Sequence, residues 1–150
     1  MELKKIAKTL VAVHSFKTSL SKINDAVGVK PMQIMEALQK QNLEPNAPQI
    51  WNYIGCDGKM ESEFTLEICF PVDKKGSDTK VIVFKELPPF NCLSYIHNGS
   101  WSEFGKVYVK IFSEMGKTGA IPTGINREVY LNCDFEDPSK CITEIQIEVK

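Results

Sequence analysis

The chain has 150 residues, which suffices for one domain or for two small halves that share a core. With 43% hydrophobic and 25% charged residues, its composition excludes a disordered chain. The net charge of −1 gives no general attraction for phosphate backbones, so we expect no direct binding to nucleic acid.

No apolar run reaches the length of a membrane span, and the N-terminal run Leu10–Val13 is too short for a signal peptide. We therefore expect a cytoplasmic protein without membrane contact. The five cysteines are scattered and form no Cys-x-x-Cys pair, so neither a bound metal nor another cofactor is predicted. Cys69 and Cys92 lie in strand patterns, which favours small, buried and reduced side chains.

The first half of the chain predicts one strand, two helical segments and two further strands. In chain order these cover residues 6–16, 21–27, 31–41, 49–55 and 61–72. Pro31 separates the helical segments, because proline lacks the amide proton that a helix interior needs. Asp57-Gly58 predicts a tight type I′ turn between the last two strands. A polar linker, residues 73–78, ends this half.

The second half repeats that order, with two strands, one helix and a closing strand pair. Its segments cover residues 81–84, 90–96, 101–116, 127–134 and 142–149. Pro88-Pro89 predicts a break or bulge between its first two strands. Apolar residues from Phe104 to Met115 follow a 3.6-residue period, which makes this the clearest helix in the chain.

The two halves, at about residues 1–73 and 79–150, align with each other. A shift of 77 residues superimposes Tyr53 on Tyr130, Glu67 on Glu144, Ile68 on Ile145 and Val72 on Val149. Two β-α-β-β units can join edge to edge into one antiparallel sheet with both helices on one face. We therefore predict a single α+β domain of duplicated units, with a ligand groove between its two main helices. The alternative is a plain α+β domain whose halves share only their patterning.

Three segments of the second half resemble the GyrI-like small-molecule-binding domain, also called the AraC-type effector-binding domain. They are Tyr95–Trp101, Arg127–Asn132 and Thr143–Val149. The family shows His-x-Gly-Pro-aromatic, Glu-x-Tyr and Thr-Glu-Ile-x-Ile-Pro-Val segments, and here Ser100 and Glu148 replace the two prolines.

That family forms the drug-sensing half of some MerR-type transcription regulators. The resemblance therefore implies a bacterial small-molecule-binding domain of the multidrug-binding kind. The chain begins directly in its first predicted strand, so we expect a stand-alone domain rather than a complete regulator with its own DNA-binding segment.

The resemblance also implies that Glu128 of the Glu-x-Tyr strand faces the ligand groove, together with Tyr130. Strand alternation independently places both side chains on one face. A buried carboxylate among aromatic rings suits a cationic or amine-bearing aromatic ligand. The alternative for Glu128 is a strand-end carboxylate paired with Arg127 or a lysine.

Four further aromatic residues are predicted to line the site. Trp51 and Tyr53 match Glu128 and Tyr130 in the repeat, although packing in the core is the alternative for both. Trp101 opens the second helix, and Tyr95 lies on the strand that leads to it.

Three other titratable residues are left outside the predicted site. Glu67 and Glu144 occupy equivalent strand positions and alternate away from their apolar neighbours, so both are predicted to face solvent. His97 is a candidate for catalysis, but a structural hydrogen bond at the end of its strand is the favoured interpretation.

Four functions are compatible with these residues and with what the family resemblance implies. The favoured one is a binder that sequesters or senses a small molecule and passes a signal to a separate regulatory protein. The second is a small-substrate hydrolase in which Glu128 acts as general base and Tyr130 or Tyr95 orients a water. A protein-interaction role like that of gyrase inhibitory protein is the third, and haem binding by analogy with the SOUL fold is the fourth. No nucleophile elbow, metal set or phosphate loop indicates catalysis.

Overall fold

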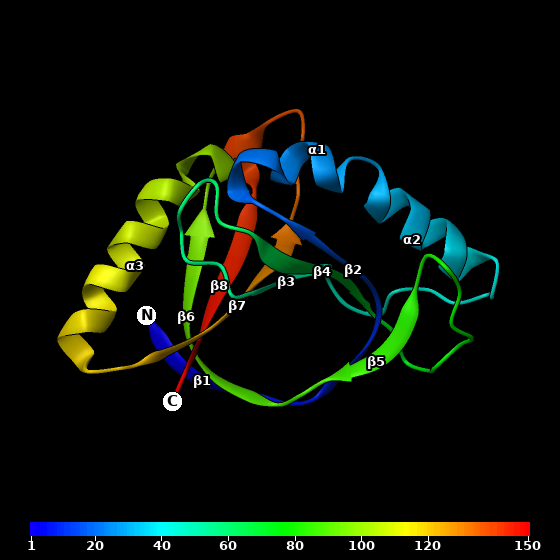
Figure 1. The fold of residues 1–150 in the computed structure, drawn as a ribbon, viewed down its shortest axis with the longest axis horizontal. Helices are drawn as coiled ribbons and strands as arrows, with labels where there is room; N and C mark the ends of the chain where they lie inside the picture. The colour runs from blue at the N-terminus through cyan, green and yellow to red at the C-terminus, as the bar shows by residue number, and fades with distance from the viewer.

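The computed structural model describes all 150 residues as one eight-stranded antiparallel sheet with helices over one face (Figure 1). The strands are β1 (Glu2–Ile6), β2 (Thr9–Thr18), β3 (Ile50–Ile54), β4 (Phe64–Pro71), β5 (Val83–Leu87), β6 (Phe90–Asn98), β7 (Pro122–Asn132) and β8 (Ile142–Val149). The helices are α1 (Ile23–Val27), α2 (Lys30–Gln39) and α3 (Phe104–Thr118).

The two main helices form where the apolar period predicts them. Helix α3 buries Val107, Ile111 and Met115 on one stripe and ends at Gly119, whose φ of 74° is a left-handed conformation that favours glycine. Helix α2 has proline in its first turn and buries Ile34 and Leu38. None of the helices is long and apolar enough to cross a membrane.

The strand order confirms the predicted fold class. The order is β1-β6-β8-β7-β3-β4-β2-β5. The strands β1 to β4 of the first half correspond, in chain order, to β5 to β8 of the second half. Replacing each strand by its counterpart gives the same order in the reverse direction. The central pair is therefore β3 and β7, one strand from each half. Helices α1 and α2 cover the first half of the sheet and α3 covers the second (Figure 1).

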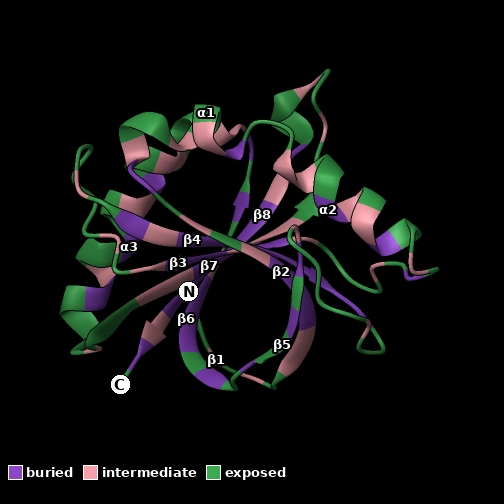
Figure 2. Cartoon of the chain, turned by 45° about the vertical axis from the view of Figure 1, so that its right-hand side comes forward, coloured by how far each residue is buried: buried purple, intermediate pink, exposed green.

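Two long bent strands curl the sheet back on itself. β1 runs into β2, β5 runs into β6, and these two segments pair in one continuous antiparallel register from Ile6↔Phe90 to Thr9↔Leu87. The bend falls at residues 7–8 and 88–89, where Pro88-Pro89 lack the amides needed for a regular ladder. The bent ribbon closes beneath the sheet in Figures 1 and 2.

The curl gives the sheet a buried face on each side. On the helix side, Ile68 of β4 packs in the cluster under α2, and Ile145 of β8 packs in the cluster under α3. Inside the curl, a third cluster contains Val13, Ile50 and Cys69. Cys69 and Cys92 are buried as predicted.

The prediction that Glu67 and Glu144 face solvent is wrong. Both point away from the helices, as alternation requires, but their residues are only 4% and 9% exposed. Glu67 forms an ion pair with Lys85, and Glu144 pairs with Lys4 at 3.2 Å. The second face is buried because the sheet curls over it, and strand alternation carries no information about such closure.

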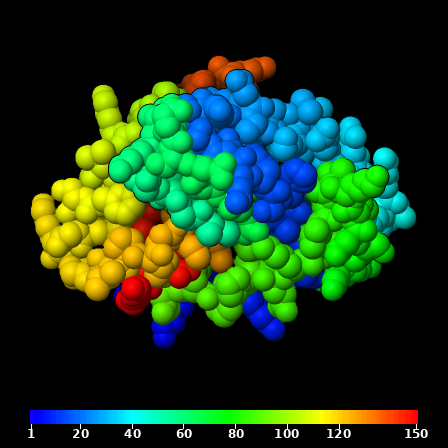
Figure 3. Space-filling model, in the orientation of Figure 1, coloured from blue at the N-terminus to red at the C-terminus, as the bar shows by residue number.

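The tight turn at Asp57-Gly58 is also wrong. β3 ends at Ile54 and β4 begins at Phe64, so residues 55–63 form a longer connection. The Asp57 carboxylate accepts hydrogen bonds from the Lys59 amide and the Ser62 hydroxyl, both at 2.9 Å, and so stabilises a wider loop. From the side shown in Figure 3, this loop lies on the surface between α3 and the segment of α1.

Candidate functional site

Glu128 lies at the centre of the helix-covered face. On β7 it pairs with Trp51 of β3 on one side and with Ile145 of β8 on the other. Because β3 and β7 form the middle of the sheet, the side chain lies where the cluster under α2 meets the cluster under α3. The residue is 3% exposed, so the acid points inward as the sequence predicts.

Three phenols hold the Glu128 carboxylate. The Tyr108 hydroxyl donates to Oε1 at 2.7 Å, while those of Tyr53 and Tyr130 donate to Oε2 at 3.1 and 2.5 Å. Tyr53 and Tyr130 come from the two central strands, whereas Tyr108 reaches down from α3. These bonds satisfy a group whose burial without partners would cost several kcal/mol, on the order of 2–7 for a polar group.

The carboxylate has no basic partner. No ion pair in the structure involves Glu128. Arg127, the alternative partner, points to the opposite face, where its guanidinium lies 3.7 Å from the centroid of the Phe90 ring and donates to the Pro88 carbonyl. Glu128 is thus a buried acid held by neutral donors alone.

Aromatic rings form a wall beside this acid. Trp51 and Trp101 both contact the Tyr130 ring edge to face, with centroids 5.2 and 6.1 Å away. The Trp101 indole donates to the Thr143 hydroxyl at 3.3 Å. All three residues are half-buried, whereas Glu128 is 3% exposed.

Tyr95 is not brought to the acid. It lies in the same row across the sheet, but Ile145 of β8 stands between it and Glu128. Two strand spacings separate the residues by about 10 Å. Tyr95 instead packs in the cluster under α3, below the ammonium of Lys110.

The sequence analysis missed two residues of the site. Tyr108 fits the apolar period of α3, and nothing in that spacing shows that its hydroxyl reaches Glu128. Asn126 donates to the Tyr108 oxygen at 3.0 Å, so the single phenolic hydrogen is directed at the carboxylate. A polar residue two positions before Glu128 on the same strand face was the available signal for Asn126.

His97 has a structural environment. Its Nε2 lies 3.1 Å from the Ser100 carbonyl, and its ring contacts Phe104 edge to face at 5.6 Å. This matches the favoured interpretation of a hydrogen bond at the strand end. No group of three or more His, Cys, Asp or Glu side chains is placed to hold a metal ion.

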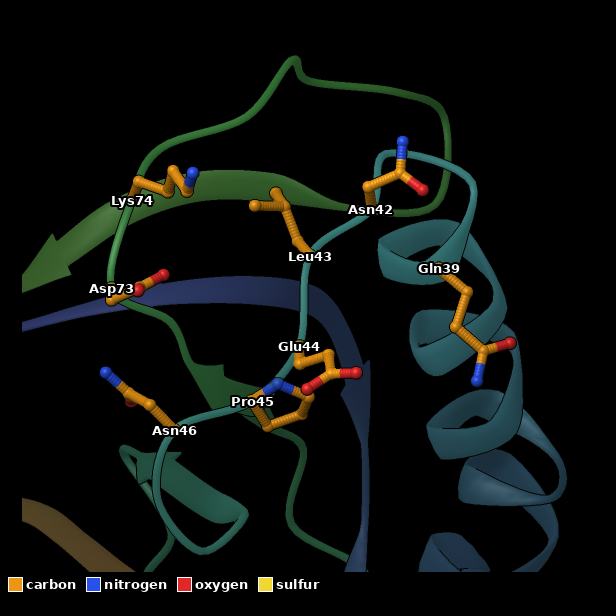
Figure 4. Close-up of a pocket in the computed structure, with 8 residues that line it drawn as sticks. All are labelled: Gln39, Asn42, Leu43, Glu44, Pro45, Asn46, Asp73 and Lys74. Atoms are coloured by element: carbon orange, nitrogen blue, oxygen red, sulfur yellow. The ribbon is translucent and has the colours of Figure 1, made fainter.

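A surface pocket elsewhere contains none of the predicted site residues. It has a volume of about 480 Å³ and lies beside the C-terminal end of α2 (Figure 4). Its lining is Gln39, Asn42, Leu43, Glu44, Pro45, Asn46, Asp73 and Lys74. With one hydrophobic side chain among eight, it lacks the apolar lining typical of small-molecule sites.

Burial raises the pKa of Glu128 above its ordinary value, although the three phenolic hydrogen bonds act in the opposite direction. Burial and the neighbouring carboxylate also raise the pKa values of Tyr53, Tyr108 and Tyr130. The phenols therefore stay protonated at neutral pH and remain donors. The acid is the group whose charge depends on its surroundings.

The raised pKa of Glu128 predicts a pH-dependent stability. The folded chain holds this proton more tightly than the unfolded chain, so the stabilisation is complete below about pH 4.3, the usual glutamate pKa, and is lost as the pH rises through the folded-state pKa. Each unit by which the folded-state pKa exceeds the unfolded-state pKa corresponds to about 1.4 kcal/mol of stability. Urea unfolding should show that the free energy of unfolding of wild type falls, relative to that of Glu128→Gln, as the pH rises through this range. A constant difference would contradict the assignment.

Comparison with known proteins identifies the family of this chain. The model of the GyrI-like small molecule binding domain matches residues 1–150. A comparison with curated protein sequences finds no significant match.

Solved structures show the same fold. The crystal structure of the EcmrR C-terminal domain is similar with a TM-score of 0.84 and 22% identity, covering 99% of this chain and 96% of that one. In the cryo-EM structure of the EcmrR–DNA complex the TM-score and identity are the same, and the likeness covers 56% of the longer EcmrR chain. The structure of SAV2435 bound to tetraphenylphosphonium has a TM-score of 0.69 and 13% identity, covering 99% of this chain and 93% of that one.

The match to the family model spans every element from β1 to β8, and the sheet with its two helices follows the fold of the EcmrR C-terminal domain. This chain therefore belongs to the family of the GyrI-like small molecule binding domain.

Proposed function

We propose that this domain binds lipophilic aromatic cations at Glu128, beneath α3. The observation that carries the proposal is a buried carboxylate with no basic partner, held by three neutral phenols. A cationic ligand would supply the counter-charge that the protein itself leaves out. In a buried setting this attraction is stronger than in water, because the effective dielectric constant is lower.

The aromatic wall suits the same class of ligand. Trp51, Trp101 and Tyr130 present ring faces and edges next to the acid, and a cation is attracted to the faces of such rings. All three residues are half-buried, so part of each is open to solvent. A flat or ring-bearing cation can therefore contact the rings and the acid together.

Tyr108 occupies the helix-facing side of the carboxylate. A ligand that reaches Oε1 has to displace this hydroxyl, either by rotation of the side chain or by a movement of α3. Tyr53 and Tyr130 are fixed on the central strands and can keep Oε2 hydrogen-bonded while the ligand is bound.

The structural relatives support this assignment. SAV2435 has the same fold and is seen bound to tetraphenylphosphonium, and the EcmrR C-terminal domain belongs to a protein that is seen in a complex with DNA. We infer a cytoplasmic ligand sensor that passes its signal to a separate regulatory protein. The net charge of −1 gives no general attraction for phosphate backbones, so we expect no direct binding to DNA.

The test uses the two tryptophans, which both lie at the site and are the only ones in the chain. Their fluorescence is followed while the full chain is titrated with tetraphenylphosphonium or with triphenylphosphine oxide, a neutral molecule with similar rings. We expect the cation to bind at least ten-fold more tightly, about 1.4 kcal/mol. Equal affinities, or a fluorescence change with neither compound, would refute cation binding at this site.

A further inference from the structure

Two cysteines lie one residue beyond the last pair of β7 and β8, where the strands meet their connecting loop. The last paired residues are Asn132 of β7 and Ile142 of β8, so the next pair outward in that register is Cys133 and Cys141. The Asn132 side chain also donates to the Lys140 carbonyl at 2.8 Å and holds the two ends of the loop together. Opposed residues of antiparallel strands have Cα atoms about 4.5–5.5 Å apart, which is within the range of disulfides.

Sulfur contacts support this placement. The Cys141 Sγ accepts a hydrogen bond from the amide of Asp134 at 3.4 Å and lies 3.6 Å from the Asp134 carbonyl oxygen, so it touches the residue that directly follows Cys133. Cys133 is exposed and Cys141 is buried. One thiol is thus open to an oxidant, and the second is sheltered beside it.

We propose that Cys133 and Cys141 form a reversible disulfide when the protein meets a peroxide. The exposed Cys133 thiolate attacks the O–O bond of hydrogen peroxide, which gives a sulfenic acid and one water after proton transfer. The Cys141 sulfur then attacks the Cys133 sulfur, the S–S bond forms, and the hydroxyl leaves as a second water. In total the two thiols lose two protons and two electrons, and one peroxide is reduced to two waters.

This disulfide would tie redox state to the aromatic wall. The loop that it closes carries Phe135, an 82% exposed residue whose ring contacts Trp101 at 5.5 Å. Trp101 in turn contacts Tyr130, one of the phenols that hold Glu128. In Figure 1 this loop is the orange segment that projects above β7 and β8. A change in the loop is therefore expected to alter tryptophan fluorescence without any ligand.

The pKa of the Cys133 thiol is raised by its partial burial and by the neighbouring Cys141. Because the thiolate is the reactive form, oxidation should become faster as the pH rises. Cys69 and Cys92 are buried on β4 and β6, so their thiols are less open to the oxidant than that of Cys133.

Peptide mapping tests the proposal on the full chain. Trypsin cuts after Arg127 and Lys140, so Cys133 and Cys141 fall on the separate peptides 128–140 and 141–150. After one equivalent of hydrogen peroxide, we expect these two peptides to run as one linked species that dithiothreitol separates. The linked species should be absent from Cys133→Ser and Cys141→Ser and unchanged in Cys56→Ser. Tryptophan fluorescence should change on oxidation of wild type and not of Cys141→Ser.

Two results would overturn it. One is Cys133 oxidised to sulfinic acid while Cys141 remains a free thiol. The other is Cys133 linked to a second copy of the chain, detected as a dimer on a non-reducing gel. Both outcomes leave ligand binding at Glu128 untouched, so a failure here is distinct from a failure of the proposed function.

Discussion

Glu128→Gln should weaken tetraphenylphosphonium binding by about 100-fold. Two unit charges about 5 Å apart at an effective dielectric constant of about 20 attract by about 3 kcal/mol, and 100-fold corresponds to about 2.7 kcal/mol. Glutamine keeps the shape and an oxygen that Tyr53, Tyr108 or Tyr130 can use, so the loss reports the missing charge rather than a collapsed site. The two tryptophans report binding, and titration calorimetry gives the affinity independently.

Glu67→Gln is the matched control for this experiment. Glu67 is also a buried glutamate, but it lies on the opposite face of the sheet and already has Lys85 as its partner. Its neutralisation should leave the affinity for the cation within about two-fold of wild type, less than about 0.5 kcal/mol. If both variants lose affinity equally, the cation is not responding to the charge of Glu128. Turnover of an added ester by wild type and not by Glu128→Gln would instead favour the hydrolase alternative.

Tyr108→Phe should tighten tetraphenylphosphonium binding by about ten-fold. The Tyr108 hydroxyl donates to the Glu128 carboxylate and accepts from Asn126. The ligand has to replace the bond from Tyr108 to the carboxylate. A hydrogen bond to a charged group contributes about 1.5–3 kcal/mol. Removal of the Tyr108 hydroxyl takes this bond away from the unbound domain and not from the complex, so the free energy needed to make room for the ligand falls. The variant keeps the ring, which packs against the cluster under α3, so the packing of α3 on the sheet is retained.

Tyr53→Phe separates this effect from a general loss of phenols. Tyr53 donates to the other carboxylate oxygen from a central strand and is expected to keep doing so in the complex. Its removal should therefore leave the affinity unchanged or weaken it. An equal gain in both variants would mean that the phenols only compete with the cation. A loss in Tyr108→Phe would mean that this hydroxyl contacts the ligand instead of excluding it.

The family resemblance, together with strand alternation, predicted the inward direction of Glu128 but not its full surroundings. Alternation along β7 places Glu128 and Tyr130 on one face, and the apolar period of α3 places a helix above them. The contact of the Tyr108 hydroxyl with Glu128 was missed because helical spacing predicts on which face the ring packs and not which group its hydroxyl oxygen contacts. Tyr95 was included because its motif is adjacent along the chain, whereas the sheet order inserts β8 between it and the acid.

The wrong predictions for Glu67 and Glu144 share one physical cause, which is pairing between segments far apart in the chain. The curl depends on the register of residues 2–13 with residues 83–94, and no local window of sequence contains both. Once the sheet closes, the face that carries Glu67 and Glu144 is buried although its alternation is that of a solvent face. Both acids then depend on lysines from the bent strands, Lys85 on β5 and Lys4 on β1.

A crystal structure of the full chain with tetraphenylphosphonium tests the central claim most directly. We predict that the phosphonium lies beside the Glu128 carboxylate against Trp51, Trp101 or Tyr130, with the Tyr108 hydroxyl withdrawn from Oε1. Density for the cation at any other place, with the bond between Tyr108 and Glu128 intact, would contradict the account.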